Sequence, residues 1–460
     1  MAYSALAITL IAGGAFFVPI CAQERAVQVV TLTTLYDLAD RQSQKVRVSE
    51  VALRAADEGV AAAKSALLPS VDLNLQGSYT GNALMLSRGF SSSGTTDYIV
   101  PGVGTVPVAN GKQDTPHWGN SFTAQVSQVV YAGGAIRSGI RMAELSKEMA
   151  ELDVEKNRQE VRFLLTGYYL DLCKLDNQME VVRQNIALTQ KEIEQMKARR
   201  GEGTVLQNDI TRYEFQLQSL ELTLTKLKDA STVINHQLVT TLHLPEQTVI
   251  VPDKNELDTE INALSAIAAQ ETWQQTAADN NLGIRQATVA TNLAEQKVKQ
   301  VKAESLPSVA VVAENQLYGP YTQDLIPKDC NVNVWFVGIG VKFSIGSLWK
   351  NKHNIRKARI EHQQSQEALA LAHEEVENGV QANYTNLLTS YTEVKTQQKQ
   401  VELANQNYSV VQNRYQNELA LLTDMVDASN MKLSAEMALV NARIGMLYNF
   451  YKLKYVTNTL

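Results

Sequence analysis

Two aspartates near the C-terminus, Asp424 and Asp427, are the residues of this sequence whose type and spacing are best suited to chemistry. Residues three apart share one face of a helix. Leu422, Val426 and Leu433 follow the apolar seam of the same segment, so both carboxylates lie away from that seam. Taken alone, this pattern is typical of a solvated helix face. Several copies of the chain meeting at this face would instead gather carboxylates that attract cations.

Catalytic and metal-binding motifs are missing from the sequence. The six histidines include no pair four residues apart and have no neighbouring cysteine, and there is no P-loop, GxSxG or HExxH motif. Cys173 and Cys330 lie too far apart in the chain to suggest a metal site or a disulfide framework. The net charge is −6 and no basic stripe is visible, which argues against a nucleic-acid partner. We expect no enzyme, no cofactor and no metal.

The N-terminus predicts export from the cytoplasm. An apolar run from Ala5 to Ile20 precedes polar residues, which predicts a signal peptide over residues 1–22. Cys21 leaves lipidation as a less favoured alternative, because Ile20 is bulky where lipoprotein signals need a small residue. No later run approaches the roughly 20 apolar residues that a membrane-spanning helix needs.

Long helices are expected in both halves of the chain. No proline occurs between His117 and Leu244, or after Lys328, and proline breaks helix interiors. Apolar residues recur every three or four positions in these stretches, as at Val161, Leu165, Tyr168, Leu172 and Leu175. Such seams predict two hairpins of side-by-side helices, over residues 134–243 and 348–455.

The two halves repeat one plan. Leu68-Pro69-Ser70-Val71 matches Leu306-Pro307-Ser308-Val309. A helix is expected before each motif, over 36–66 and 276–305. Two strands are expected around or after each motif, over 70–82 and 119–131 in the first half and over 307–319 and 332–344 in the second. The domains are therefore a first structural repeat (23–243), a linker or equatorial segment (244–275) and a second structural repeat (276–460).

The predicted strands alternate polar and apolar residues over about ten positions, which fits a transmembrane barrel. Four strands cannot close a barrel, and open edges cannot face lipid. The chain must therefore oligomerise, and two, three or four copies would all close the sheet. Residues 83–118 are rich in Gly, Ser and Thr and are expected to form a long surface loop between strands.

The segment from Arg414-Tyr415 to Asp424-Met425-Val426-Asp427-Ala428 resembles the arginine–tyrosine, turn, aspartate–x–x–aspartate–alanine signature of TolC-like outer-membrane factors. The duplicated strand–strand–hairpin unit resembles this family over nearly the whole mature chain. The resemblance implies a mixed α/β membrane protein, a homotrimer in which each chain gives four strands to a twelve-stranded outer-membrane β-barrel. A long periplasmic coiled-coil barrel of α-helices would continue it.

The resemblance also implies a function and partners. The trimer would sit in outer-membrane lipid as the exit duct of a tripartite efflux or type I secretion system, passively conducting small molecules or proteins. It would dock on a periplasmic adaptor, a membrane fusion protein, which is attached to an inner-membrane pump of the RND or ABC type. The sequence identifies neither the exported substrate nor the pump class.

Residue roles follow from the same resemblance. The pore constriction would be formed by Asp424, Asp427 and Tyr415. The adaptor-docking tips would be formed by Arg199, Arg200, Gly201, Gly203, Thr204, Glu418, Leu419 and Ala420. This chain departs from the family in having Glu418 where a glycine is usual and Ala420 where an arginine stands near the gate.

A periplasmic or surface coiled-coil protein without a channel, a structural spacer or adhesin, is the alternative. It would explain the heptads and the signal peptide. It would not explain four alternating strands or the internal duplication.

Overall fold

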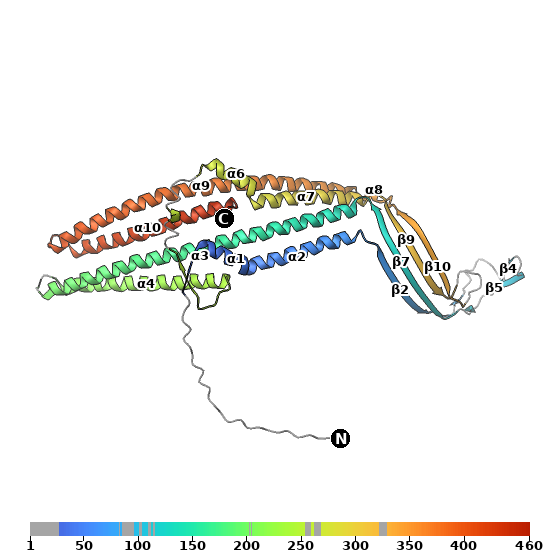
Figure 1. Cartoon of the computed structure of the whole chain (residues 1–460), viewed down its shortest axis with the longest axis horizontal. Helices are drawn as coiled ribbons and strands as arrows, with labels where there is room; N and C mark the ends of the chain where they lie inside the picture. The colour runs from blue at the N-terminus through green and yellow to red at the C-terminus, as the bar shows by residue number, and fades with distance from the viewer. Residues whose placement is uncertain are drawn as a thin grey trace, which may run out of the picture. The chain divides into compact units, whose positions relative to one another are not determined.

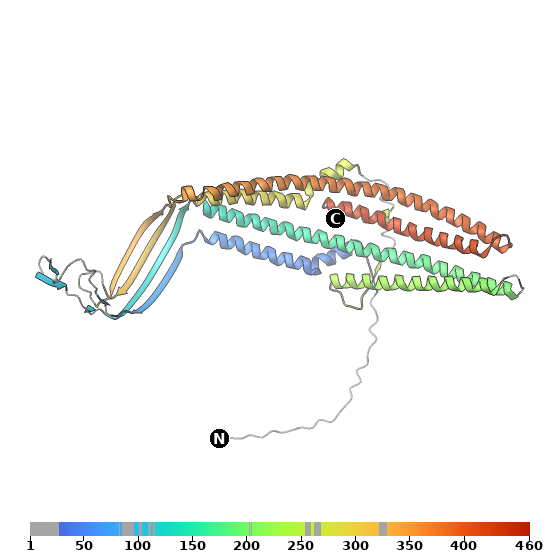
Figure 2. The same ribbon diagram turned by 180° about the vertical axis from the view of Figure 1, so that it is seen from behind.

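The computed structural model describes residues 27–81, 83–84, 96–100, 104–108, 112–113, 116–201, 203, 205–253, 259–261, 268–321 and 329–460. The expected signal peptide, Thr204, most of the 83–118 loop and part of the 244–275 linker lie outside these residues. The described chain consists mainly of long helices, with fewer residues in strands, which confirms the mixed helix and sheet class (Figures 1 and 2).

Contacts divide the chain into two compact units, each built from segments of both sequence halves. Unit 1 comprises Met1–Arg47, Asn157–Asn280 and Glu377–Leu460, and unit 2 comprises Val48–Lys156 and Asn281–Val376. The units therefore do not follow the division into two sequence repeats, because equivalent segments of the two repeats pack together within each unit.

Unit 2 contains a four-stranded antiparallel sheet. Its strands are β2 (Ser70–Tyr79), β7 (Trp118–Ala132), β9 (Ser308–Gly319) and β10 (Val332–Lys342). Their order is β10-β9-β7-β2, so each sequence repeat supplies one antiparallel pair and β7 joins the pairs by contacting β9 (Figure 1). Strands β2 and β10 are the edges of this sheet and run in opposite directions.

The register gives this sheet one apolar and one mostly polar face. One row across the four strands consists of Val71, Val126, Ala313 and Val337. The next row consists of Asp72, Gln125, Glu314 and Phe336. Successive residues of a strand point to opposite faces. The apolar positions expected separately in each strand therefore fall on one common face.

Short strand pairs lie within the predicted surface loop. Strands β3 (Ala83–Leu84) and β6 (Lys112–Gln113) pair with one another, as do β4 (Thr96–Val100) and β5 (Gly104–Val108). The loop thus contains secondary structure that its Gly- and Ser-rich composition does not predict.

Helices of unit 2 extend from the strands. They are most of α2 (Gln44–Ser65), the first part of α3 (Ala135–Gly201), α7 (Leu282–Ala303), the short α8 (Ser347–Lys350) and the first part of α9 (Lys352–Gln416). Helix α7 packs on α3 in a cluster that contains Leu282 and Val289 of α7 and Leu145 and Leu152 of α3. Helix α7 also packs on α9, where Val298 and Ala358 belong to one cluster. Their heptad seams are the contacts that hold the unit together.

The segments expected as helices 36–66 and 276–305 each contain a break. Helix α1 (Leu32–Gln42) ends before Ser43, and α6 (Gln270–Asn280) ends before Asn281. Both break residues have extended backbone, and the Asn281 side chain accepts hydrogen bonds from the first turn of α7. A capping residue of this kind favours a new helix start over continuation, although it leaves the apolar periodicity unchanged.

Unit 1 holds the two helical hairpins. Helix α4 (Gln207–Thr241) returns along α3, and α10 (Leu422–Val456) returns along α9 (Figure 1). The parallel strands β1 (Val27–Val30) and β8 (Val249–Pro252) complete the unit. Near the hairpin turns a common core joins the helices, formed by Ile193, Met196, Val205, Ile210, Tyr213, Tyr408, Leu422, Met425 and Ala428.

Candidate functional site

The two hairpin turns are built alike. A left-handed residue lies two positions after the last residue of each long helix: Gly203 after α3, with a φ of 81°, and Glu418 after α9, with a φ of 61°. The N–H of Glu418 donates to the Tyr415 carbonyl at 3.1 Å, and the next N–H donates to the Arg414 carbonyl at 2.7 Å. These two bonds define a Schellman cap, in which glycine is the usual left-handed residue. In the first turn, the N–H of Gly203 donates to the Arg200 carbonyl at 3.0 Å, which corresponds to the bond from Glu418 to Tyr415.

Glu418 is therefore a strained residue at the second turn. A side chain in the left-handed region brings Cβ close to the following carbonyl oxygen, which costs roughly 1–2 kcal/mol. Although residue 418 is a glutamate, the backbone there has the conformation that glycine favours. Such strain persists only where surrounding contacts hold it in place.

Arg199 connects the two turns. Its guanidinium lies 3.6 Å from the Glu418 carboxylate and 5.9 Å from the centre of the Tyr415 ring. The Arg199 side chain is about a quarter exposed and the Glu418 side chain two-thirds exposed, at 26% and 67%. Arg414 instead donates to the Leu419 carbonyl within its own turn, at 3.2 Å. The sequence identified Arg199 and Glu418 as turn residues but not as partners, because they belong to different hairpins.

Asp424 has a structural role that its sequence context does not reveal. Its carboxylate accepts a hydrogen bond from the N–H of Leu421 at 3.1 Å, in the first turn of α10. Asp209 does the same for Leu206 in the first turn of α4, at 3.4 Å. A carboxylate at this position satisfies a free N–H and interacts favourably with the helix dipole. Sequence rules for capping missed both, because each N-cap residue is a leucine.

Asp427 is exposed and contacts a groove between α4 and α10 with a volume of about 560 Å³. Phe215, Arg212 and Asn430 line the same groove. Phe215 is 79% exposed, so its ring is open to solvent at this groove. Asp424 and Asp427 are therefore both on the exposed side of α10, as their spacing predicted, but only Asp424 caps the helix.

Behind the turns, polar groups are buried in the shared core. The Glu192 carboxylate accepts a hydrogen bond from the Gln412 side chain at 2.6 Å and belongs to a residue that is 5% exposed. Burial, together with the nearby Glu192, raises the pKa of the Tyr213 and Tyr408 phenols. Burial also raises the pKa of Tyr415. The sequence resemblance names Tyr415 alone of these three, because Tyr213 and Tyr408 lie on apolar seams and look like ordinary core residues.

The remaining turn residues lie at the surface. Arg200, Gly201, Gly203 and Leu419 are exposed, and Ala420 is half-buried. Thr204 lies outside the described residues. Within the described chain no cluster of histidine, cysteine, aspartate or glutamate could hold a metal ion. The turns thus offer charged and apolar contact groups rather than a reaction centre.

The sequence matches the outer membrane efflux protein family over residues 35–242 and 273–458. The chain belongs to this family. The efflux protein is 20% identical to the outer membrane protein TolC of Salmonella enteritidis over 441 residues, covering 94% of this chain and 83% of that protein. It is 21% identical to the outer membrane efflux protein BepC of Brucella suis biovar 1, covering 94% and 86% of the two chains.

The fold of this efflux protein is also that of solved channels. The crystal structure of the outer membrane protein VceC from Vibrio cholerae superposes with a TM-score of 0.70 at 16% identity, covering 93% of this chain and 95% of the other. The expected class and location are therefore confirmed: the efflux protein is an outer-membrane channel that extends into the periplasm, and it is not an enzyme. Among the described helices, none is long and apolar enough to cross a membrane.

Proposed function

We propose that three copies of this efflux protein form the exit duct of a tripartite efflux or type I secretion system. The duct passively conducts small molecules or proteins that an inner-membrane pump, of the RND or ABC type, delivers through a periplasmic adaptor. The hairpin turns dock on the adaptor, and Asp424, Asp427 and Tyr415 form the constriction.

The two-faced sheet carries this proposal. Its apolar face, exemplified by Val71 and Val337, suits contact with lipid, and the polar side chains of β2, β7 and β9 suit a water-filled lumen. The edge strands β2 and β10 run in opposite directions, so identical copies joined edge to edge remain antiparallel throughout. Three copies would give a twelve-stranded barrel.

The constriction is tested by removing charge without removing the helix cap. Alanine at Asp424 would also lose the hydrogen bond to Leu421, at a cost of about 1 kcal/mol. Asparagine keeps an acceptor oxygen. The double variant Asp424→Asn/Asp427→Asn should keep the trimer, reduce cation selectivity in planar bilayers and relieve block by a trivalent cation, most strongly at low salt.

Asp209→Asn is the matched control, because Asp209 caps α4 as Asp424 caps α10. It should leave selectivity unchanged. Equal selectivity and equal block in the wild type and the double variant would assign the aspartates to an ordinary solvated face. A chain that never runs as a trimer before boiling would overturn the exit-duct proposal itself.

The docking role is tested at the exposed arginine. Charge reversal at Arg200 should abolish export while unboiled trimers persist, because the side chain is exposed at the turn. Arg183→Glu, on α3 far from the turn, is the control and should export normally. Loss of the trimer in Arg200→Glu would make the turn a folding element instead.

A further inference from the structure

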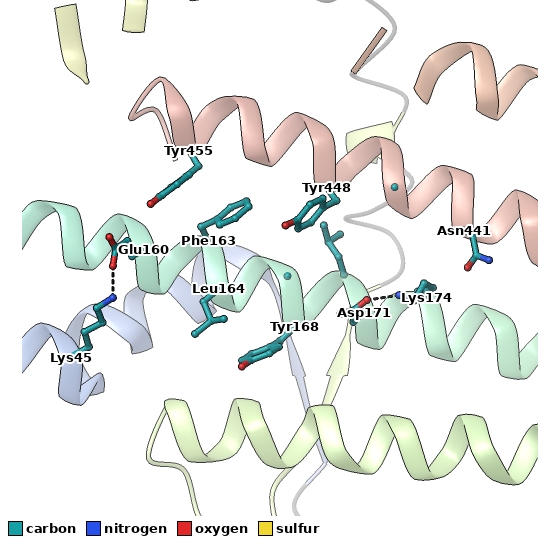
Figure 3. A pocket seen from close by; sticks show the side chains of 13 residues that line it. Lys45, Glu160, Phe163, Leu164, Tyr168, Asp171, Lys174, Asn441, Tyr448 and Tyr455 are labelled. Carbon is teal, nitrogen blue, oxygen red and sulfur yellow. Dashed lines mark hydrogen bonds and ion pairs between the residues drawn. The ribbon is translucent and has the colours of Figure 1, made fainter. Parts of the chain in front are cut away.

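A second hollow lies within unit 1, far along the helices from the turns. It is a groove of about 950 Å³ between α3 and α10, with one end of α2 at its rim (Figure 3). Ligand sites in proteins commonly have volumes of 300–1,000 Å³. Its lining is Lys45, Glu160, Phe163, Leu164, Gly167, Tyr168, Leu170, Asp171, Lys174, Asn441, Gly445, Tyr448 and Tyr455.

Two helix-interior glycines help to make the groove hollow. Gly167 of α3 and Gly445 of α10 both line it, and a Cβ added at either would meet no atom within 4 Å. Glycine inside a helix costs about 1 kcal/mol relative to alanine. Close packing within this chain does not require glycine at either position, and the missing side chains leave the space above the backbone open.

Aromatic rings form one wall of the groove. Phe163 stacks on Tyr455 with ring centres 4.7 Å apart and an angle of 17° between the planes, and it lies 5.6 Å from Tyr448. Figure 3 shows these three rings close together between α3 and α10. The Tyr448 side chain is 38% exposed, so part of its ring is open to solvent. Such a wall offers a planar aromatic molecule a stacking surface.

Charges on the groove are paired. Lys45 binds Glu160 at one end, and Lys174 binds Asp171 at the other (Figure 3). Two acids and two bases leave the lining without net charge, and Asn441 adds an amide. The groove therefore selects for ring area and hydrogen bonding more than for charge. Exposed ion pairs also argue against a buried contact with another protein, because the centres of protein interfaces are depleted in charged residues.

The spacing of residues along α10 puts the groove lining from this helix on the same helix face as Asp427 of the proposed constriction. Residues 424, 427, 431, 434, 438, 441, 445, 448, 452 and 455 of α10 follow steps of three and four, and all are exposed or half-buried. Residues with this spacing lie on one face of a helix that packs by heptads. If Asp427 lines the pore, Asn441, Gly445 and Tyr448 line it too, about 21–32 Å further along at 1.5 Å per residue.

We propose that this groove is a binding site for planar aromatic molecules in transit through the channel. The proposal rests on the proposed function, since it takes the stripe of Asp427 as the pore surface. A passing aromatic molecule stacks against Tyr448 and Phe163 and lies over the open backbone at Gly445 and Gly167. The site slows aromatic cargo without changing the flow of small ions.

The test uses the trimer in planar bilayers with two cations of equal charge, planar aromatic ethidium and non-aromatic tetraethylammonium. Tyr448→Ala removes a ring, and Gly445→Leu fills the groove while favouring the helix. Both should shorten ethidium-induced current interruptions by about 2- to 10-fold, the range expected for one aromatic contact. Interruptions by tetraethylammonium should not change. Tyr384→Ala and Gly139→Leu, which lie outside the groove, are the controls.

The outcomes separate the possible explanations. Equal ethidium interruptions in the wild type, Tyr448→Ala and Gly445→Leu overturn the binding site, while the conducting channel survives. Loss of the trimer in Gly445→Leu, with Gly139→Leu intact, also overturns it, because a second copy of the chain then fills the groove. A wild-type protein that conducts no current contradicts the proposed function instead.

Discussion

Glu418 combines an unfavourable backbone conformation with a favourable ion pair to Arg199. Its left-handed backbone would be relaxed by glycine, whereas its carboxylate contacts Arg199 of the other hairpin. A partly exposed ion pair contributes about 0.2–1 kcal/mol, less than the strain. The residue therefore lowers the stability of its own turn while its ion pair connects the two turns.

Two substitutions separate these effects. Glu418→Gly should raise the melting temperature slightly, because it relieves about 1 kcal/mol of strain. Glu418→Gln should lower it slightly, because the strain remains and the ion pair is lost. Both should raise channel conductance to the level of Arg199→Gln, since all three release the tie between the turns. Conductance of Glu418→Gln at the wild-type level, with Arg199→Gln raised, would show that Arg199 acts through Tyr415 instead.

The hydroxyl oxygen of Tyr213 is buried and makes no hydrogen bond within the described structure. The residue as a whole is 2% exposed. Removing an unsatisfied buried hydroxyl is neutral or stabilising by about 1 kcal/mol. Tyr213→Phe should therefore keep or raise the free energy of unfolding in urea. Tyr36→Phe should lower it, because the Tyr36 hydroxyl lies 2.6 Å from the Thr166 hydroxyl; equal effects would contradict this assignment.

At the scale of elements, the helix ends repeat with a constant offset. The left-handed residues Gly203 and His243 of the first hairpin correspond to Glu418 and Asn458 of the second, each 215 residues later. The N–H groups of His243 and Asn458, and of the residue after each, also donate the same pair of capping hydrogen bonds. The duplicated hairpin thus keeps its backbone geometry even where its side chains differ.

The bundle of helices behind the turns should loosen at alkaline pH. Tyr213, Tyr408 and Tyr415 have pKa values raised above their ordinary value by burial. An unfolded tyrosine ionises at a pKa of about 10, so the stabilisation is complete below this pH and is lost as pH rises through the folded-state pKa. The free energy of unfolding should fall above pH about 10, by up to about 1.4 kcal/mol per pH unit for each of the buried Tyr213 and Tyr408. The half-buried Tyr415 should contribute less, because solvent screens its charge.

The measurement is urea unfolding between pH 8 and 11, followed on the wild type and Tyr408→Phe. The variant should show a shallower decline, since it has one fewer group to ionise. Tyr384→Phe, outside this core, should decline as the wild type does. Parallel curves for the wild type and Tyr408→Phe would mean that the buried phenols do not control alkaline stability.

At the scale of the whole molecule, the proposed barrel requires the two faces of the sheet to meet different surroundings. Leu73 and Asn74 are neighbours on β2 that point to opposite faces. Lysine on a lipid-facing position near the centre of a membrane costs about 2–4 kcal/mol, and lysine facing the lumen costs little. Three copies would multiply this penalty, so one substitution should be enough to disturb assembly.

Leu73→Lys should reduce the yield of heat-sensitive trimers in the outer-membrane fraction, whereas Asn74→Lys should assemble normally. The comparison needs no further control, because the residues are adjacent and receive the same side chain. Normal assembly of Leu73→Lys together with failure of Asn74→Lys would reverse the assignment of the two faces.

The sequence by itself determined the local elements of this protein. Missing prolines and heptad seams predicted the hairpins of α3 with α4 and of α9 with α10, and alternation predicted the strands. The family signature around Asp424 and Asp427 indicated the channel class. These patterns are readable because helix and strand periodicity depends on residues a few positions apart. The sequence did not predict the helix breaks at Ser43 and Asn281, because a cap interrupts a helix without changing the spacing of its apolar residues.

Only the tertiary structure decided which of these elements meet. The contact of Arg199 with Glu418 joins different hairpins, and the wall of Phe163 and Tyr448 joins helices from different repeats. The common apolar face likewise depends on the register of β7 against β9. Such contacts are long-range, because they follow from how whole helices and strands pack. The residues next to one another in the chain do not determine that packing.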